Sequence, residues 1–266
     1  MRRVGLLLAF LISLSACRKR PDPVAVPVDT TKPGNTVDST KADTLRTLKM
    51  SFDAVVGKKP LVFGSEAYRN ANGDSFTVSK YRYYISNVKL TATDGKVYAE
   101  PESYHLIDHK TAGAAAFTMS GVPDRNYTRI TFMIGVDSLR NVSGAQTGAL
   151  DPINGMFWDW NTGYIMAAME GNVKDGTANG KPMALHIGGF DQANSVLKWV
   201  TLDLQKPVTA GKDKKPVIYI TSDVQEWFST PNPIDIKKTP LVMKVGMSAQ
   251  AIAENYADMF KVDHIE

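Results

Sequence analysis

Apolar and polar residues alternate over residues 48–56 of this 266-residue chain. Five apolar side chains fall on one side of this segment, and mainly polar ones lie between them: Leu48, Met50, Phe52, Ala54 and Val56. A period of two residues is typical of a half-buried β-strand. The sequence therefore predicts that the folded part of the chain opens with a strand.

Runs rich in Tyr, Val, Ile and Thr recur further along the chain and are separated by turn residues. Asn72-Gly73 and Asp94-Gly95 are hairpin pairs that accept positive φ angles. Further strands are predicted at 76–78, 81–93, 104–108, 127–136, 164–170, 182–187, 196–204 and 216–221. Many short strands with turns between them predict an all-β fold, namely an antiparallel β-sandwich with Greek-key-like connections.

One short C-terminal helix is expected in addition. With Ser248 as the N-cap, Ile252, Tyr256, Met259 and Phe260 recur at helical spacing and form one apolar stripe. A shorter helical turn is possible on the same grounds over residues 223–228.

The first 16 residues resemble a bacterial secretion signal, with Arg2 and Arg3 before an apolar stretch over residues 4–14. The sequence Leu14-Ser15-Ala16-Cys17 then has the pattern of a lipobox, in which the peptidase cuts before the cysteine and the thiol receives a lipid. Cys17 is the only cysteine of the chain, so we predict that it is the lipid attachment point. The alternative is an ordinary signal peptide with an incidental cysteine.

Residues 17–47 are rich in Pro, Thr, Asp and Lys without an apolar period, and this composition predicts a disordered tether. Residues 48–266 are then a single domain of ordinary size. The net charge of +4 falls to +2 when Arg2 and Arg3 leave with the signal, and the basic excess lies in the tether. A near-neutral domain lacks the basic footprint of a nucleic-acid-binding protein, so no nucleic-acid partner is expected.

Histidines are the first candidates for chemistry. His186 lies opposite Leu185 and Ile187 in a predicted strand and precedes Gly188-Gly189, which permits close approach of a ligand. The alternative is a hydrogen-bonded structural histidine.

His105 and His109 would lie about 13 Å apart on an extended strand, so at most one of them binds a given metal ion. We expect His109 to be a free surface residue. The fourth histidine, His264, lies close to the C-terminal residue of the chain.

The other candidates are aromatic or oxygen-bearing. Trp158 and Trp160 share one face of an extended segment and would form an aromatic wall, or else a structural pair that covers the sheet. Asp137, Asp151 and Asn154 offer oxygen atoms suited to calcium, although turn and capping roles explain such residues equally simply. No common catalytic motif is present, which favours a binding protein over an enzyme.

Several segments together resemble the MbnP-like family of copper-binding envelope proteins, whose name refers to a methanobactin-associated periplasmic protein. They are GVDS, AQTGALDP, MFWDWNTGYI and HIGGF, with PLVFGSEAY and YRYYISNVKL upstream, and the resemblance covers residues 48–264. It implies copper as the metal, a docked final strand over residues 260–264, and a di-haem partner enzyme that oxidises a Trp to kynurenine.

Cu(I) accepts imidazole and thioether ligands, and the mature domain has no free thiol. We therefore expect a lipid-anchored envelope protein that binds Cu(I) through His186, His264 and His105 for uptake, storage or delivery. It would face the periplasm or the cell surface from the outer membrane. The alternative is a glycan-binding or scaffold lipoprotein of an outer-membrane assembly, with sugars stacked on Trp158, Trp160, Trp199 and Trp227.

The lipid assignment predicts that Cys17→Ser releases the protein from membranes, because the lipoprotein pathway needs the cysteine thiol. Fractionation of cells that express the parent or the variant checks this expectation. Unchanged processing and membrane association of Cys17→Ser would contradict it.

Overall fold

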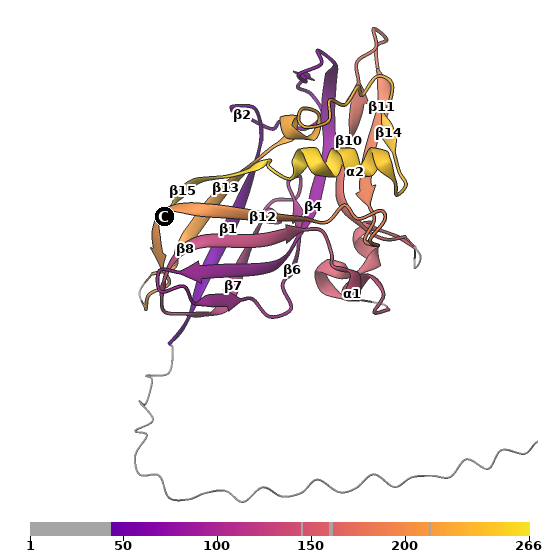
Figure 1. Cartoon of the computed structure of the whole chain (residues 1–266). Coiled ribbons are helices and arrows are strands. Elements are labelled where there is room, and N and C mark those ends of the chain that lie inside the picture. Colours follow the sequence, from indigo (N-terminus) through magenta and orange to yellow (C-terminus); the bar gives the residue numbers. More distant parts are fainter. Residues whose placement is uncertain (1–43, 145, 160–161, 213) are drawn as a thin grey trace, which may run out of the picture. The chain divides into compact units, whose positions relative to one another are not determined.

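The computed structural model describes residues 44–144, 146–159, 162–212 and 214–266, without the side chain of Asp159. Cys17 and Trp160 lie outside the described residues. The described residues form two β-sheets that are covered in part by short helices (Figure 1). The first strand begins at Leu45, so residues 45–47 belong to it rather than to the tether.

The smaller sheet has five strands in the order β15-β13-β1-β2, with β7 also paired to β1. Its strands are β1 (Leu45–Val56), β2 (Lys59–Pro60), β7 (Ala116–Pro123), β13 (Val217–Asp223) and β15 (Phe260–Ile265). β1 and β13 run parallel, whereas the other pairs are antiparallel. The predicted docked final strand is confirmed, since β15 pairs with β13.

The larger sheet has ten strands, and its main path is β12-β8-β4-β10-β11-β14. The strands on this path are β4 (Ser75–Ala92), β8 (Asn126–Ile134), β10 (Gly163–Val173), β11 (Lys181–Gly188), β12 (Lys198–Thr209) and β14 (Leu241–Val242). Four short strands flank it: β3 (Tyr68–Arg69), β5 (Val97–Ala99), β6 (Tyr104–Asp108) and β9 (Phe157–Asp159). β11 and β14 are parallel, so both sheets are mixed and not purely antiparallel.

Strand β4 organises the larger sheet. It is 18 residues long and pairs with β10 and then β8 along one edge, and with β3, β6 and β5 along the other. Gly171 of β10 lies directly against β4, because a Cβ atom at this position would overlap the carbonyl oxygen of Thr77. A glycine is therefore required where these two backbones approach most closely.

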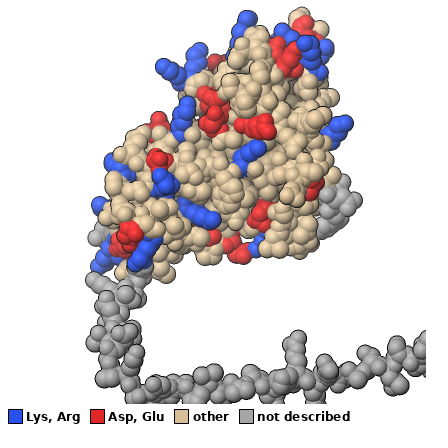
Figure 2. Space-filling model, viewed as in Figure 1, with Lys and Arg blue, Asp and Glu red and all other residues tan. Residues whose placement is uncertain are grey.

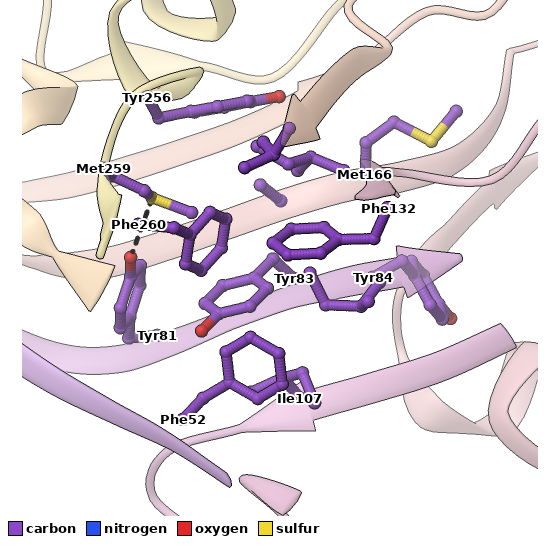
Figure 3. Close-up of a cluster of buried hydrophobic side chains, with 14 of the residues drawn as sticks. Phe52, Tyr81, Tyr83, Tyr84, Ile107, Phe132, Met166, Tyr256, Met259 and Phe260 are labelled. Atoms are coloured by element: carbon purple, nitrogen blue, oxygen red, sulfur yellow. Dashed lines mark hydrogen bonds between the residues drawn. The ribbon is translucent and has the colours of Figure 1, made fainter. Parts of the chain in front are cut away.

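The sheets pack through aromatic side chains. Phe52 of β1 contacts the rings of Tyr83, Phe132 and Phe260, with centroid distances of 6.2, 6.3 and 5.8 Å (Figure 3). Edge-on ring contacts of this kind add to the free energy gained by burying the rings. The predicted β-sandwich is thus confirmed, and its core lies between β1 and the middle of β4.

Helical segments are few and short. They are α1 (Ser138–Asn141), α2 (Met247–Tyr256) and the 3-10 turns η1 (Gly148–Leu150), η2 (Pro152–Asn154) and η3 (Val224–Trp227). No helix within the described ranges is long and apolar enough to cross a membrane. Figure 2 shows basic and acidic side chains interspersed over the face in view.

The expected C-terminal helix exists, but its boundaries differ from the prediction. Gly246 occupies the N-cap position, so Ser248 lies inside α2, and no side chain caps the helix. Ile252 and Tyr256 are buried as predicted, whereas Phe260 already belongs to β15. The helical turn predicted over residues 223–228 is η3, which Asp223 caps through the backbone N–H of Gln225.

Most predicted strands are confirmed, and the hairpin glycines Gly73 and Gly95 have positive φ angles. One prediction needs correction, and several short strands were not predicted. Residues 76–78 and 81–93 were separate runs in the sequence but form one continuous strand, β4. Strand β7 is the longest of the strands that were not predicted, and in its segment Thr, Ser and Gly interrupt the apolar residues Phe117, Met119 and Val122.

The close approach at Gly171 predicts that Gly171→Ala destabilises the fold by about 2 kcal/mol or more, since backbone atoms must move apart. Gly211→Ala is the matched control, because a Cβ atom there comes no closer than 3.7 Å to another atom. Denaturant unfolding of both variants measures the difference. Equal midpoints for the two variants would disprove the account of this contact.

Candidate functional site

His186 lies on the outer face of the larger sheet. Its neighbours Leu185 and Ile187 are fully buried on the inner face, as the sequence predicted. The imidazole Nε2 is 2.9 Å from Oε1 of Glu170 on β10. The same oxygen lies 2.6 Å from Nζ of Lys80 on β4. Three adjacent strands therefore bring together a histidine, a carboxylate and an ammonium group.

The charges in this cluster determine which nitrogen atom of His186 is available to bind a metal ion. Burial alone would raise the pKa of Glu170, but the hydrogen bonds and charges of Lys80 and His186 outweigh it and lower that pKa. An ionised carboxylate only accepts hydrogen bonds, so Nε2 of His186 carries the proton and donates it to Glu170. When the ring is neutral, its lone pair is on Nδ1, which has no hydrogen-bond partner among the described residues.

Trp158 of β9 lies against Gly188, two residues beyond this histidine. A Cβ atom at Gly188 would be 2.5 Å from Cζ3 of the indole, so the ring occupies the space that the glycine leaves. Gly188 is two residues after His186 and therefore faces the same side of β11, about 7 Å further along. Gly188 thus permits close approach of Trp158. The two-indole wall that includes Trp160 lies outside the described residues.

His105 lies on the inner face of the larger sheet. It shares the inner side of β6 with buried Ile107, and its ring stacks on Phe117 of the smaller sheet at 3.5 Å. Its Nε2 is 2.8 Å from Oε2 of Glu100. Strands β4 and β10 lie between β6 and β11, which separates His105 from His186 by about 14 Å, and the two rings lie on opposite faces.

His264 lies on a third surface, on strand β15 of the smaller sheet. It pairs with Tyr219 and stacks on that ring at 4.2 Å, opposite the buried Ile218 and Ile220. Its Nδ1 is 2.6 Å from Oδ2 of Asp263. This surface is the outer face of the smaller sheet.

The structure therefore does not bring His186, His264 and His105 together. Within the described part of the chain, no three His, Cys, Asp or Glu side chains gather into a group that would hold a metal ion. A single ion shared by all three predicted histidines is incompatible with this arrangement. The three histidines lie on three different sheet faces, and each contacts its own carboxylate.

The prediction that His109 is a free surface residue is wrong. Its Nε2 is 2.9 Å from the hydroxyl of Tyr83, and its ring stacks on Tyr81 at 5.0 Å. Burial lowers the pKa of His109 to about 4, although the charge of Asp108 opposes this effect. His109 is therefore a neutral part of the aromatic core at neutral pH.

The three residues considered for calcium are engaged in local hydrogen bonds. Asp137 accepts from the hydroxyl of Tyr104 at 2.5 Å and from Asn87 at 3.1 Å, and it caps α1. Asp151 caps η2, and the Asn154 amide donates to two carbonyl groups of the preceding turn. This geometry corresponds to the loop-structuring alternative and gives calcium no support.

Sequence reasoning missed Glu170 and Lys80. Glu170 is the one charged residue of β10, which is a detectable signal, whereas Lys80 shares β4 with Arg82 and Lys89. Their partnership depends on the register between β4 and β10, which places Lys80 opposite Glu170. That register follows from tertiary packing and not from the local sequence.

Comparison with known proteins gives the family. The family model for MbnP matches residues 45–245, about three quarters of the chain, so the chain belongs to the MbnP family. A solved structure of MbnP from Methylosinus trichosporium shares 16% sequence identity over 70% of this chain and 78% of that chain, with a TM-score of 0.49. No curated protein matches the chain.

The family match confirms the resemblance inferred from the sequence motifs. It includes His186, Glu170 and Trp158 but ends before α2 and β15. His264 therefore lies beyond the matched residues. The family is associated with copper, and the matched region holds two histidines with a carboxylate behind them, His186 with Glu170 and His105 with Glu100. Of these two, His186 lies on the outer face of its sheet, whereas the ring of His105 is stacked on Phe117 between the sheets.

Burial of His109 predicts a loss of stability in acid. Between pH 6.5 and about 4 the unfolded chain binds a proton that the folded protein excludes, so the free energy of unfolding falls as the pH falls. The full effect is about 3 kcal/mol. His109→Gln removes this titration and should lose less stability between pH 7 and pH 4.5 in denaturant unfolding. Equal losses for parent and variant would show that His109 does not cause the acid sensitivity.

Proposed function

We propose that this protein binds copper as Cu(I) in the cell envelope and that His186 is the central ligand. The observation that carries the proposal is the contact between His186 Nε2 and Glu170, which leaves Nδ1 available. Histidines that bind metals commonly donate their second N–H to a carboxylate, which fixes the ring and makes it a stronger ligand. Membership in the copper-associated MbnP family supports the choice of metal.

The chemistry of the surroundings fits a soft monovalent ion. A neutral imidazole suits Cu(I), whereas structural zinc and calcium sites require more ligands or several oxygen atoms. The adjacent carboxylate of Glu170 is already shared between Lys80 and His186. The proposed copper ligand is thus a nitrogen atom of His186, and Glu170 of β10 and Lys80 of β4 set its orientation.

Trp158 is the second element of the proposal. Its indole lies against Gly188, two residues beyond His186 on β11, so an oxidised product would form near the proposed copper ligand. A di-haem partner enzyme would convert this side chain to kynurenine, whose ketone and aromatic amine offer further donor atoms. The part of the side chain that contacts Gly188 is the six-membered ring, which kynurenine retains.

The biological role that we propose is the handling of copper by reversible binding. A lipid at Cys17 would hold the protein at the outer membrane, and reversible binding of Cu(I) would serve uptake, storage or delivery. The glycan-binding alternative has less support, because Trp227 is fully buried and cannot stack on a sugar. Trp199 is half exposed, but the ammonium group of Lys89 lies over its ring at 5.0 Å.

The proposal predicts that His186→Ala weakens Cu(I) binding by 100-fold or more, since loss of a ligand exceeds the 10- to 100-fold effect of losing a group behind one. Glu170→Gln should weaken it by about tenfold, because the amide does not hold the same tautomer as firmly. His264→Ala is the control, since that ring lies on the outer face of the other sheet. Competition with a chromophoric Cu(I) chelator gives the three affinities, and thermal unfolding checks the fold. Parental affinity in His186→Ala would refute the assignment.

A further inference from the structure

The residue that follows the short strand β14 is a methionine, Met243. β14 runs parallel to β11, with Leu241 opposite Ala184 and Val242 opposite Leu185. The backbone N–H of Ala184 donates to the carbonyl of Pro240 at 2.9 Å, which anchors this pairing. The paired residues end at Leu185 and Val242, and continuing their register by one residue would set Met243 opposite His186.

The exposure of these residues shows which face Met243 occupies. Val242 is 4% exposed, like the buried Leu185 beside it, whereas Leu241 and Met243 are 58% and 54% exposed. Residues two apart on a strand share a face. From this alternation of exposure we infer that Met243 lies on the outer face with His186, although the strand itself ends at Val242. Neighbouring strands are only about 4.8 Å apart.

β11 lies between β10 and β14 (Figure 1), so His186 has different neighbours on its two sides. Glu170 of β10 receives the proton of Nε2 on one side. Met243 lies on the other side, where no charged partner of His186 is found among the described residues. A thioether and an imidazole nitrogen are thus presented together on one exposed face.

An exposed thioether is unusual in this protein. Seven other methionines are at most 2% exposed and fill the core, namely Met50, Met119, Met156, Met166, Met169, Met183 and Met259. Met243 instead lines an open hollow of about 590 Å³ formed by residues 241–248. Core filling, the ordinary role of methionine, does not account for its position.

We propose that Met243 is a thioether ligand of Cu(I) and completes, with Nδ1 of His186, a nitrogen and sulfur pair at the end of β11. This inference rests on the proposed function, but the proposed function does not itself require Met243 as a ligand. Thioether sulfur binds Cu(I) in preference to Zn(II), Mg(II) or Ca(II), which favour harder donors. The pair would therefore give the site its selectivity for the monovalent ion.

The test compares Met243→Leu with Met247→Leu in the complete protein. Met247 lines the same hollow and is 86% exposed, but it begins α2 instead of facing His186. Leucine keeps the apolar volume and removes the sulfur. Met243→Leu should weaken Cu(I) binding about tenfold or more in chelator competition and abolish copper–sulfur scattering in X-ray absorption of the Cu(I) protein. Met247→Leu should change neither measurement.

The results separate the two proposals. Parental affinity in Met243→Leu, or no copper–sulfur scattering in the parent, overturns the methionine ligand, while weak binding by His186→Ala in the same assay keeps the histidine assignment. Parental affinity in His186→Ala overturns both. Equal losses in Met243→Leu and Met247→Leu also overturn the inference, because they would show an effect of the apolar hollow and not of one sulfur atom.

Discussion

The packing of Phe52 against the rings around Tyr83 is the contact on which the rest of the structure depends. It joins the smaller sheet to the middle of β4, and Phe260 closes the same cluster from β15. Because β4 pairs with five other strands, fixing β4 fixes most of the larger sheet. Glu170 lies on the next strand, β10, and His186 lies on the strand after it, β11. The positions of Lys80, Glu170 and His186 on the outer face therefore depend on the aromatic core beneath them.

Strand alternation then decides what each histidine can do. A side chain one residue earlier or later on a strand points to the opposite face, so a register shift of one residue would bury His186 and expose Leu185. The same rule turns His105 inward and His264 to the far side of the sandwich. Histidines that look equivalent in the sequence therefore reach three separate surfaces. The cluster around His186 differs from the others because Lys80 also holds its carboxylate partner.

The sequence predicted what depends on local pattern. The strands, the hairpin glycines and the outward position of His186 follow from alternation and turn chemistry, and the motifs indicated the family. It did not predict what depends on pairing across long separations, such as the contact of Lys80 with Glu170, which lie 90 residues apart. The position of His109 shows the same limit, because only the folded core reveals the hydroxyl of Tyr83 beside it. Ser248 failed as an N-cap since Gly246, two residues earlier, already turns the chain into α2.

The central claim is that Glu170 holds the proton of His186 on Nε2 and leaves Nδ1 for copper. Long-range proton–nitrogen NMR of the imidazole rings tests it most directly, because Cu(I) is diamagnetic and each nitrogen has its own resonance. The account predicts an Nε2–H tautomer for His186 in the metal-free protein and a shift of its Nδ1 resonance when one equivalent of Cu(I) is added. The resonances of His105 and His264 should stay in place. Cu(I)-dependent shifts at His105 or His264 with His186 unchanged would contradict the account.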